Sequence, residues 1–99
     1  MVKTKAAAER RLAALYRRNG CIRLPNRERC REEGPARYKK GYEVRLTAND
    51  RAELKEIPRL LELAGYRAGK PHAKGNRWRI PVYGREAVDR FLAMVRRCR

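Results

Sequence analysis

The sequence has few side chains that bind metals and few acidic ones. Its 99 residues include one histidine, three cysteines, and 11 aspartates and glutamates. Cys21, Cys30 and Cys98 form no Cys-x-x-Cys pair, and only His72 could join them, which argues against a zinc site. We therefore expect three reduced thiols and no cofactor. His72 itself is expected to be a solvated loop residue, with a phosphate contact as the weaker alternative.

Long apolar runs are also missing. No stretch approaches the roughly 20 consecutive apolar residues of a membrane span, and the alanines at 6–8 lead directly into Glu9 and Arg10. A helix bound at a membrane surface needs a broad apolar face opposite a basic one, and no predicted helix separates the two cleanly. These absences predict a cytoplasmic chain without a membrane partner.

Positive charge, in contrast, is in large excess. Lysine and arginine total 27, which gives a formal net charge of +16. Such a surplus raises association rates with phosphate backbones and makes the affinity fall with salt. The length and the 42% hydrophobic content suit one compact domain, here residues 1–99. We expect that domain to bind a nucleic acid, foremost double-stranded DNA.

Two segments near the ends of the chain have helical spacing. Residues 5–18 consist of good helix formers, and Asn19 and Gly20 are expected to end this helix in the left-handed conformation. Residues 85–97 form the last predicted helix. Its expected buried face consists of Ala87, Val88, Phe91, Leu92 and Val95.

A further helix is predicted in the middle of the chain. Asn49 or Asp50 can cap it, apolar residues recur through Leu63, and Gly65 ends it. Pro58 removes one backbone hydrogen bond and is expected to kink or split this helix near residues 56–57.

Period-two alternation predicts the strands. The four expected strands are residues 21–24, 42–47, 66–70 and 77–83, with 71–76 as a turn and 26–40 as an exposed, mobile loop. Val44 and Leu46 should face the core while Arg45 and Thr47 face outward. Pro81 predicts an edge or bulged position in the last strand.

This order of elements predicts an α+β domain with an antiparallel sheet and helices on one face. The free face of the sheet would carry Arg23, Arg45, Arg77 and Arg79. A solvated charged face is the simpler interpretation for any single strand. Because three strands share the bias, we favour contacts to phosphates and to guanine edges in a major groove.

The end of the first helix carries a motif. Residues 12–20 read L-A-A-L-Y-R-R-N-G, in register with L-A-G-L-I-D-A-D-G. Leu12, Ala13, Leu15 and Gly20 match, and Ala14 replaces the small glycine. On this motif and the order of elements, residues 8–95 resemble one repeat of the LAGLIDADG homing-endonuclease family. The resemblance implies an αββαββα fold that lays its sheet in the DNA major groove.

The resemblance also implies a homodimer, because single-motif members pack the motif helices of two copies side by side. The corresponding interface residues would be Leu12, Ala13, Ala14 and Tyr16. The residues expected to contact DNA in such a protein are Arg17, Arg18, Arg23, Arg45, Thr47, Arg67, Lys70, Lys74, Arg77 and Arg79.

Cleavage is disfavoured by one substitution in the motif. The last motif acid of the family holds a divalent metal that activates water, and this sequence has Asn19 there. An amide is a poor ligand for Mg²⁺, so we expect DNA binding with no catalytic residue and no metal. Arg17 and Arg18 either capture a backbone phosphate or complement the negative end of the helix dipole.

Two alternatives stay open. An active endonuclease, cutting with Mg²⁺, could use Asp50, Glu53 and Glu56 as substitute ligands, although solvated helix positions are the simpler interpretation. An RNA-binding module could stack unpaired bases on aromatic side chains. Its candidates are Tyr38, Tyr42, Trp78 and Tyr83.

Overall fold

The order of helices and strands confirms the α+β prediction. A computed structural model describes residues 3–24 and 41–98. Their elements are α1 (Lys5–Asn19), β1 (Cys21–Arg23), β2 (Glu43–Ala48), α3 (Arg51–Ala64), β3 (His72–Lys74), β4 (Arg77–Tyr83) and α4 (Arg85–Arg97). The predicted loop at 26–40, with Cys30 and Tyr38, lies outside the described residues. Among the helices that are described, none is long and apolar enough to cross a membrane.

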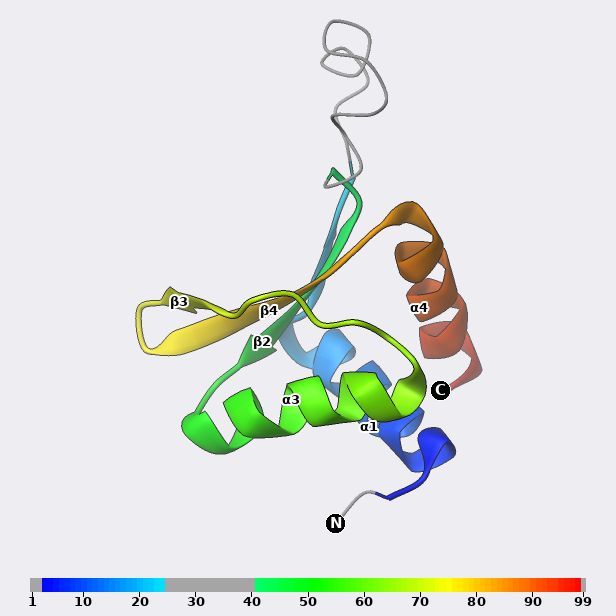
Figure 1. The fold of residues 1–99 in the computed structure, drawn as a ribbon, viewed down its shortest axis with the longest axis horizontal. Helices are drawn as coiled ribbons and strands as arrows, with labels where there is room; N and C mark the ends of the chain where they lie inside the picture. The colour runs from blue at the N-terminus through cyan, green and yellow to red at the C-terminus, as the bar shows by residue number, and fades with distance from the viewer. Residues whose placement is uncertain (1–2, 25–40, 99) are drawn as a thin grey trace, which may run out of the picture.

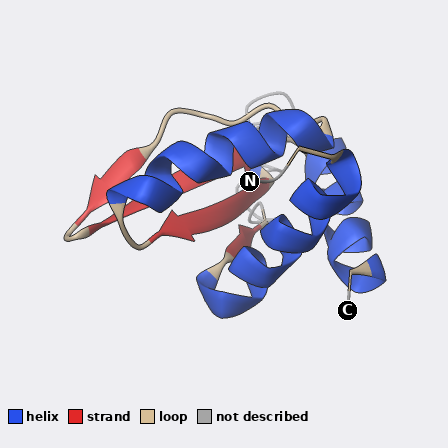
Figure 2. Ribbon diagram, turned by 90° about the horizontal axis from the view of Figure 1, so that it is seen from below, coloured by secondary structure: helices blue, strands red, loops and turns tan. Residues whose placement is uncertain are grey.

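The four strands form one antiparallel sheet in the order β1-β2-β4-β3. In its centre Val44 pairs with Val82, and Leu46 pairs with Ile80. All four side chains are buried, so the predicted inward face is confirmed. The helices pack on this face, as the two views at right angles show (Figures 1 and 2).

The core lies between the sheet and the three helices. Each helix contributes fully buried side chains: Leu12 and Leu15 from α1, Ile57 and Leu61 from α3, Phe91 and Met94 from α4. The Phe91 ring meets the rings of Tyr16 and Tyr66 edge to face, with centroids 5.7 and 5.5 Å apart. Burial of one such aliphatic or aromatic side chain contributes about 1.5–3 kcal/mol, so this layer holds the sheet in place.

Helix α3 is continuous, and the predicted split at Pro58 is wrong. Asp50 caps the helix by accepting a hydrogen bond from the Glu53 amide at 2.8 Å, and Gly65 ends it with φ of 87°. The missing hydrogen bond at Pro58 costs about 3 kcal/mol. Burial of Ile57 and of the leucines at 60 and 61 outweighs that cost.

Helix α1 ends at Gly20 for a different reason from the one predicted. Gly20 has φ −81° and ψ 163°, which is extended backbone and not the left-handed conformation. A Cβ atom at this position would lie 2.7 Å from Cδ2 of Tyr16 and 2.8 Å from its Cα. Glycine is therefore required here by close approach to the preceding turn.

The third strand lies later in the chain than predicted. Residues 66–70 form no strand, and β3 occupies His72–Lys74, where a turn was expected. The Gly69 amide donates one hydrogen bond to the Pro81 carbonyl at 2.7 Å, but Pro71 has no N–H with which to continue a ladder. Pairing with β4 begins only at His72, which is thus an exposed strand residue instead of a loop residue. β4 is an inner strand, and Pro81 pairs with Arg45 of β2, so the predicted edge position does not hold for the strand. Pro81 is tolerated because it lies beyond the part of β4 that pairs with β3.

Candidate nucleic-acid interface

The strand register gathers the outward basic residues on one face. Lys74 pairs with Arg77, His72 pairs with Arg79, and Arg79 pairs with Thr47. Side chains of directly paired residues point to the same side of a sheet. Since Arg45 precedes Thr47 by two positions, it lies on this side as well.

A hollow of about 360 Å³ opens where these strands meet the end of α1. Its described lining residues are Asn19, Cys21, Arg45, Thr47, Lys74, Arg77, Trp78 and Arg79. Four of these carry positive charge, and none is acidic. In the described part of the chain, Lys74, Arg77 and Arg79 form no ion pair. Their charge is therefore available to an anionic partner.

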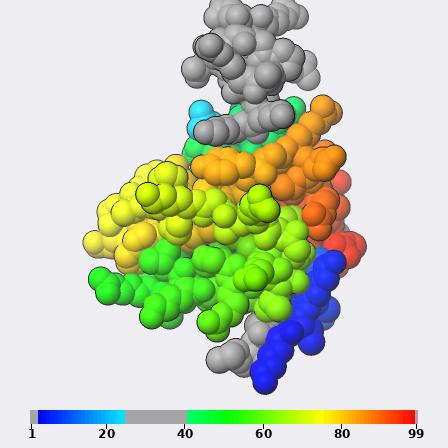
Figure 3. Space-filling model, in the orientation of Figure 1, coloured from blue at the N-terminus to red at the C-terminus, as the bar shows by residue number. Residues whose placement is uncertain are grey.

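The β3–β4 hairpin presents part of this surface on a protruding ribbon. Every residue from 72 to 77 is exposed. In Figure 1 the hairpin extends from the body of the sheet, and in Figure 3 it forms one edge of the molecule beside the start of α3. Lys74 and Arg77 therefore flank a tip that solvent surrounds.

Arg45 differs from the other basic residues of the hollow. Its guanidinium lies 3.2 Å from the Glu43 carboxylate, whose side chain is only 6% exposed. Glu43 is the one acidic residue in the described strands. Arg45 is itself largely buried, and its Nε has no hydrogen-bond partner among the described residues. It therefore both neutralises a buried carboxylate and lines the hollow.

Arg18 has partners inside the chain. Its guanidinium donates two hydrogen bonds of 2.7 Å to the Glu53 carboxylate and one of 3.1 Å to the Thr47 carbonyl. These bonds lower the pKa of Glu53 to about 2, with a further contribution from the Asn49 amide. Ion pairing with Glu53 in turn raises the pKa of Arg18. Arg18 thus joins α1 to α3 and β2.

Arg17 also has partners inside the chain, at the end of α4. It donates hydrogen bonds to the carbonyls of Val95 and Cys98. A cation at the C-terminal carbonyls of a helix offsets their partial negative charge. The helix end that Arg17 complements belongs to α4 and not to its own helix. Phosphate contacts by Arg17 and Arg18 stay predictions.

The remaining predicted DNA contacts lie away from the hollow. Arg23 is exposed on β1, opposite Glu43. Arg67 and Lys70 are exposed in the segment between α3 and β3. None of the three lines the hollow, so they could reach only a partner that extends beyond it.

The residues expected at a dimer interface are largely used within one chain. Leu12 and Ala13 are fully buried, and Tyr16 packs against Phe91. Only Ala14 is exposed. Helix α1 lies between α3 and α4 of the same chain, so Leu12 and Ala13 leave no surface for a second copy.

The candidate metal ligands all have hydrogen-bond or ion-pair partners within the chain. The Asn19 amide donates to the Asn49 side-chain oxygen at 3.0 Å, and Asp50 caps α3. Glu53 is held by Arg18, and Glu56 accepts two hydrogen bonds of 3.1 Å from Arg11. No group of three metal-binding side chains occurs in the described ranges. The carboxylates that Mg²⁺ prefers are thus committed elsewhere.

Cys21 lines the hollow and was missed from the sequence, and His72, for which a phosphate contact was only the weaker alternative, lies on β3 beside Arg79. The hairpin itself was also missed, with Asn76 in its two-residue turn. Gly75-Asn76 was the available signal, because a two-residue Gly-Asn step between extended segments is typical of a β-hairpin.

Comparisons of the chain with models of known protein families, with curated proteins and with solved structures find no match. The resemblance to LAGLIDADG endonucleases therefore stays a proposal.

Proposed function

We propose that this protein binds double-stranded DNA by placing the β3–β4 hairpin and the adjoining sheet face in the major groove. The observation that carries the proposal is the basic hollow, with Arg45, Lys74, Arg77 and Arg79 in its lining and no acidic residue among the described ones. The large positive net charge adds long-range attraction to any phosphate backbone.

The shape of the surface favours a duplex. A B-DNA major groove is about 12 Å wide and admits a two-stranded β-ribbon. Arginines on such a ribbon can donate two hydrogen bonds to O6 and N7 of guanine, or bind phosphates at the groove edge. Arg77 and Arg79 lie two positions apart on β4, so they share a side of the strand and can contact guanine edges or phosphates.

The RNA-binding alternative has less support from the aromatic side chains. Tyr42 and Trp78 pack against the core, and the guanidinium of Arg85 lies 5.9 Å from the centroid of the Tyr42 ring. Among the candidates that the structure describes, only Tyr83 is clearly exposed, at 42%. Stacking of successive unpaired bases needs several open rings.

The endonuclease alternative is tested by direct incubation. We propose that the chain binds DNA without cutting it, because Asn19 and the ion-paired carboxylates offer no place for Mg²⁺. Nicks in duplex DNA with Mg²⁺ or Mn²⁺ that are absent with EDTA would support the endonuclease instead.

DNA binding is tested with a pair of charge-matched double variants. We expect Arg77→Gln with Arg79→Gln to weaken duplex binding by about tenfold to a hundredfold, because two contacts are lost. Arg10→Gln with Arg96→Gln removes the same charge from exposed helical positions and should have a much smaller effect. Fluorescence anisotropy with duplex DNA, double-stranded RNA and single-stranded RNA measures both. Equal losses for the two variants, or tighter binding to single-stranded RNA, would contradict the proposal.

A further inference from the structure

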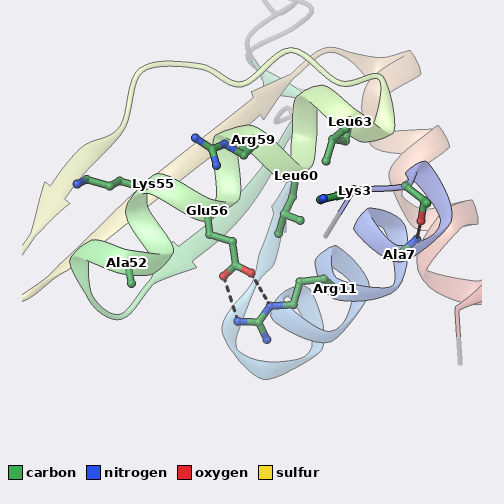
Figure 4. A pocket seen from close by; sticks show the side chains of 10 residues that line it. Lys3, Ala7, Arg11, Ala52, Lys55, Glu56, Arg59, Leu60 and Leu63 are labelled. Atoms are coloured by element: carbon green, nitrogen blue, oxygen red, sulfur yellow. Dashed lines mark hydrogen bonds and ion pairs between the residues drawn. The ribbon is translucent and has the colours of Figure 1, made fainter. Parts of the chain in front are cut away.

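A second concave surface lies between α1 and α3. It encloses about 860 Å³ and is open on one side. Ala7 lines it from α1, and Ala52, Leu60 and Leu63 line it from α3. Figure 4 shows Leu60 pointing from α3 toward α1 across this groove. Its floor is therefore apolar, unlike the hollow on the sheet.

The rim of this groove is basic. Lys3, Lys55 and Arg59 line it and form no ion pair within the described part of the chain. The one acid in its lining, Glu56, is neutralised by Arg11 across the groove at 3.1 Å, the dashed contact of Figure 4. The groove thus combines apolar contact area with uncompensated positive charge.

We propose that the α1–α3 groove binds an acidic amphipathic helix of a partner protein. Such a helix would place apolar side chains, spaced three or four residues apart, on the Leu60–Leu63 floor. Its flanking glutamates or aspartates would meet Lys3, Lys55 and Arg59. The apolar floor and the basic rim together select a partner that has both an apolar stripe and acidic side chains.

Other occupants fit this surface less well. A nucleic acid would satisfy the rim, but its phosphates cannot use the apolar floor. A second copy of the chain would bring another net charge of +16 against a basic rim. An acidic partner with an apolar stripe complements both parts.

This groove is separate from the proposed DNA surface. The two share no lining residue, and one is built from helices while the other is built from strands and the end of α1. The inference therefore does not depend on DNA binding. If both proposals hold, one chain can bind DNA and an acidic partner at the same time.

The test uses a synthetic probe and the full chain. The probe is a labelled helical peptide of about 16 residues, with leucines along one face and glutamates beside them. Its control is a scrambled peptide of identical composition, which keeps the charge and loses the stripe. In fluorescence anisotropy at physiological salt, we expect the amphipathic peptide to bind at least about tenfold more tightly than the scrambled one.

Two variants locate the binding site. Leu63→Gln removes apolar surface without changing the charge and should bring the affinity for the amphipathic peptide down to that for the scrambled one. Lys55→Glu with Arg59→Glu should weaken peptide binding by about tenfold or more, while Arg77→Glu with Arg79→Glu, matched in charge, should change it far less. Thermal melts report folding, and the exposed rim variant decides the case if Leu63→Gln is unstable.

Three outcomes would overturn the inference. Equal binding of amphipathic and scrambled peptides would mean attraction by net charge alone. Equal loss of peptide binding in the two charge-reversal variants would mean the same. A larger loss of DNA affinity in the Lys55/Arg59 variant than in the Arg77/Arg79 variant would assign the groove to nucleic acid and would also contradict the proposed DNA surface. If only peptide binding fails, the proposed DNA surface is unaffected.

Discussion

Arginines occur in both layers of the molecule, but their partners differ. In the helical layer, Arg11, Arg18 and Arg97 pair with glutamates of a different helix, at 3.1, 2.7 and 3.3 Å. In the strand layer, Arg77 and Arg79 form no ion pair with any described residue. The ion-paired arginines of the helices join one helix to another, whereas Arg77 and Arg79 are available for binding.

Arg45 is the exception, and its removal is expected to have the largest effect on stability. Arg45→Ala would leave the Glu43 carboxylate buried without a cation and should lower the free energy of unfolding by about 1–3 kcal/mol. Arg79→Ala, on the same face, should change it by less than about 0.5 kcal/mol. Urea unfolding measures both. If the two variants are equally stable, Arg45 does not stabilise the fold by neutralising Glu43.

The ion pair of Glu53 with Arg18 in the helical layer can be tested through the pH dependence of stability. Its pKa is lowered from 4.5 to about 2, so the folded state gains stability above pH 4.5 and loses it as the pH falls toward 2. Glu53→Gln should cost about 1–2 kcal/mol near neutral pH, after allowance for solvent screening. The same substitution should flatten the dependence of stability on pH across that interval. A variant that keeps the full acid dependence of the parent would show that other carboxylates cause it.

The smallest effect is expected for a surface pair of the helical layer. Arg97 lies 3.3 Å from Glu9, and its side chain is 67% exposed. Pairs exposed to this degree contribute at most about 0.5–1 kcal/mol. Arg97→Gln should therefore shift the melting temperature only slightly and leave DNA binding unchanged. A large loss of affinity would extend the DNA surface onto α4.

Local patterns were sufficient to predict the fold. Alternation placed Val44, Leu46, Ile80 and Val82 on the buried face, and helical spacing placed α4 at Arg85–Arg97. The errors came where long-range packing decides. Burial of its apolar face keeps α3 continuous through Pro58, and the position of β3 depends on hydrogen bonds to β4.

The candidate site was only partly predictable. Alternation placed Arg45, Arg77 and Arg79 on one face, because side chains two apart in a strand share a side. It could not reveal that Arg18 is committed to Glu53, or Arg45 to the buried Glu43. Such pairs join residues of different elements, or depend on burial that arises only in the folded chain. The burial of Leu12 and Ala13 within one chain was hidden for the same reason.

The salt dependence of DNA binding tests the central claim most directly. Each phosphate neutralised by a basic side chain adds about −0.9 to the slope of log affinity against log salt. We predict that Lys74→Gln, Arg77→Gln and Arg79→Gln each make the slope shallower by about 0.9, while Arg97→Gln leaves it unchanged. The same slope for the parent and the three strand variants, or an equal change in Arg97→Gln, would contradict the account.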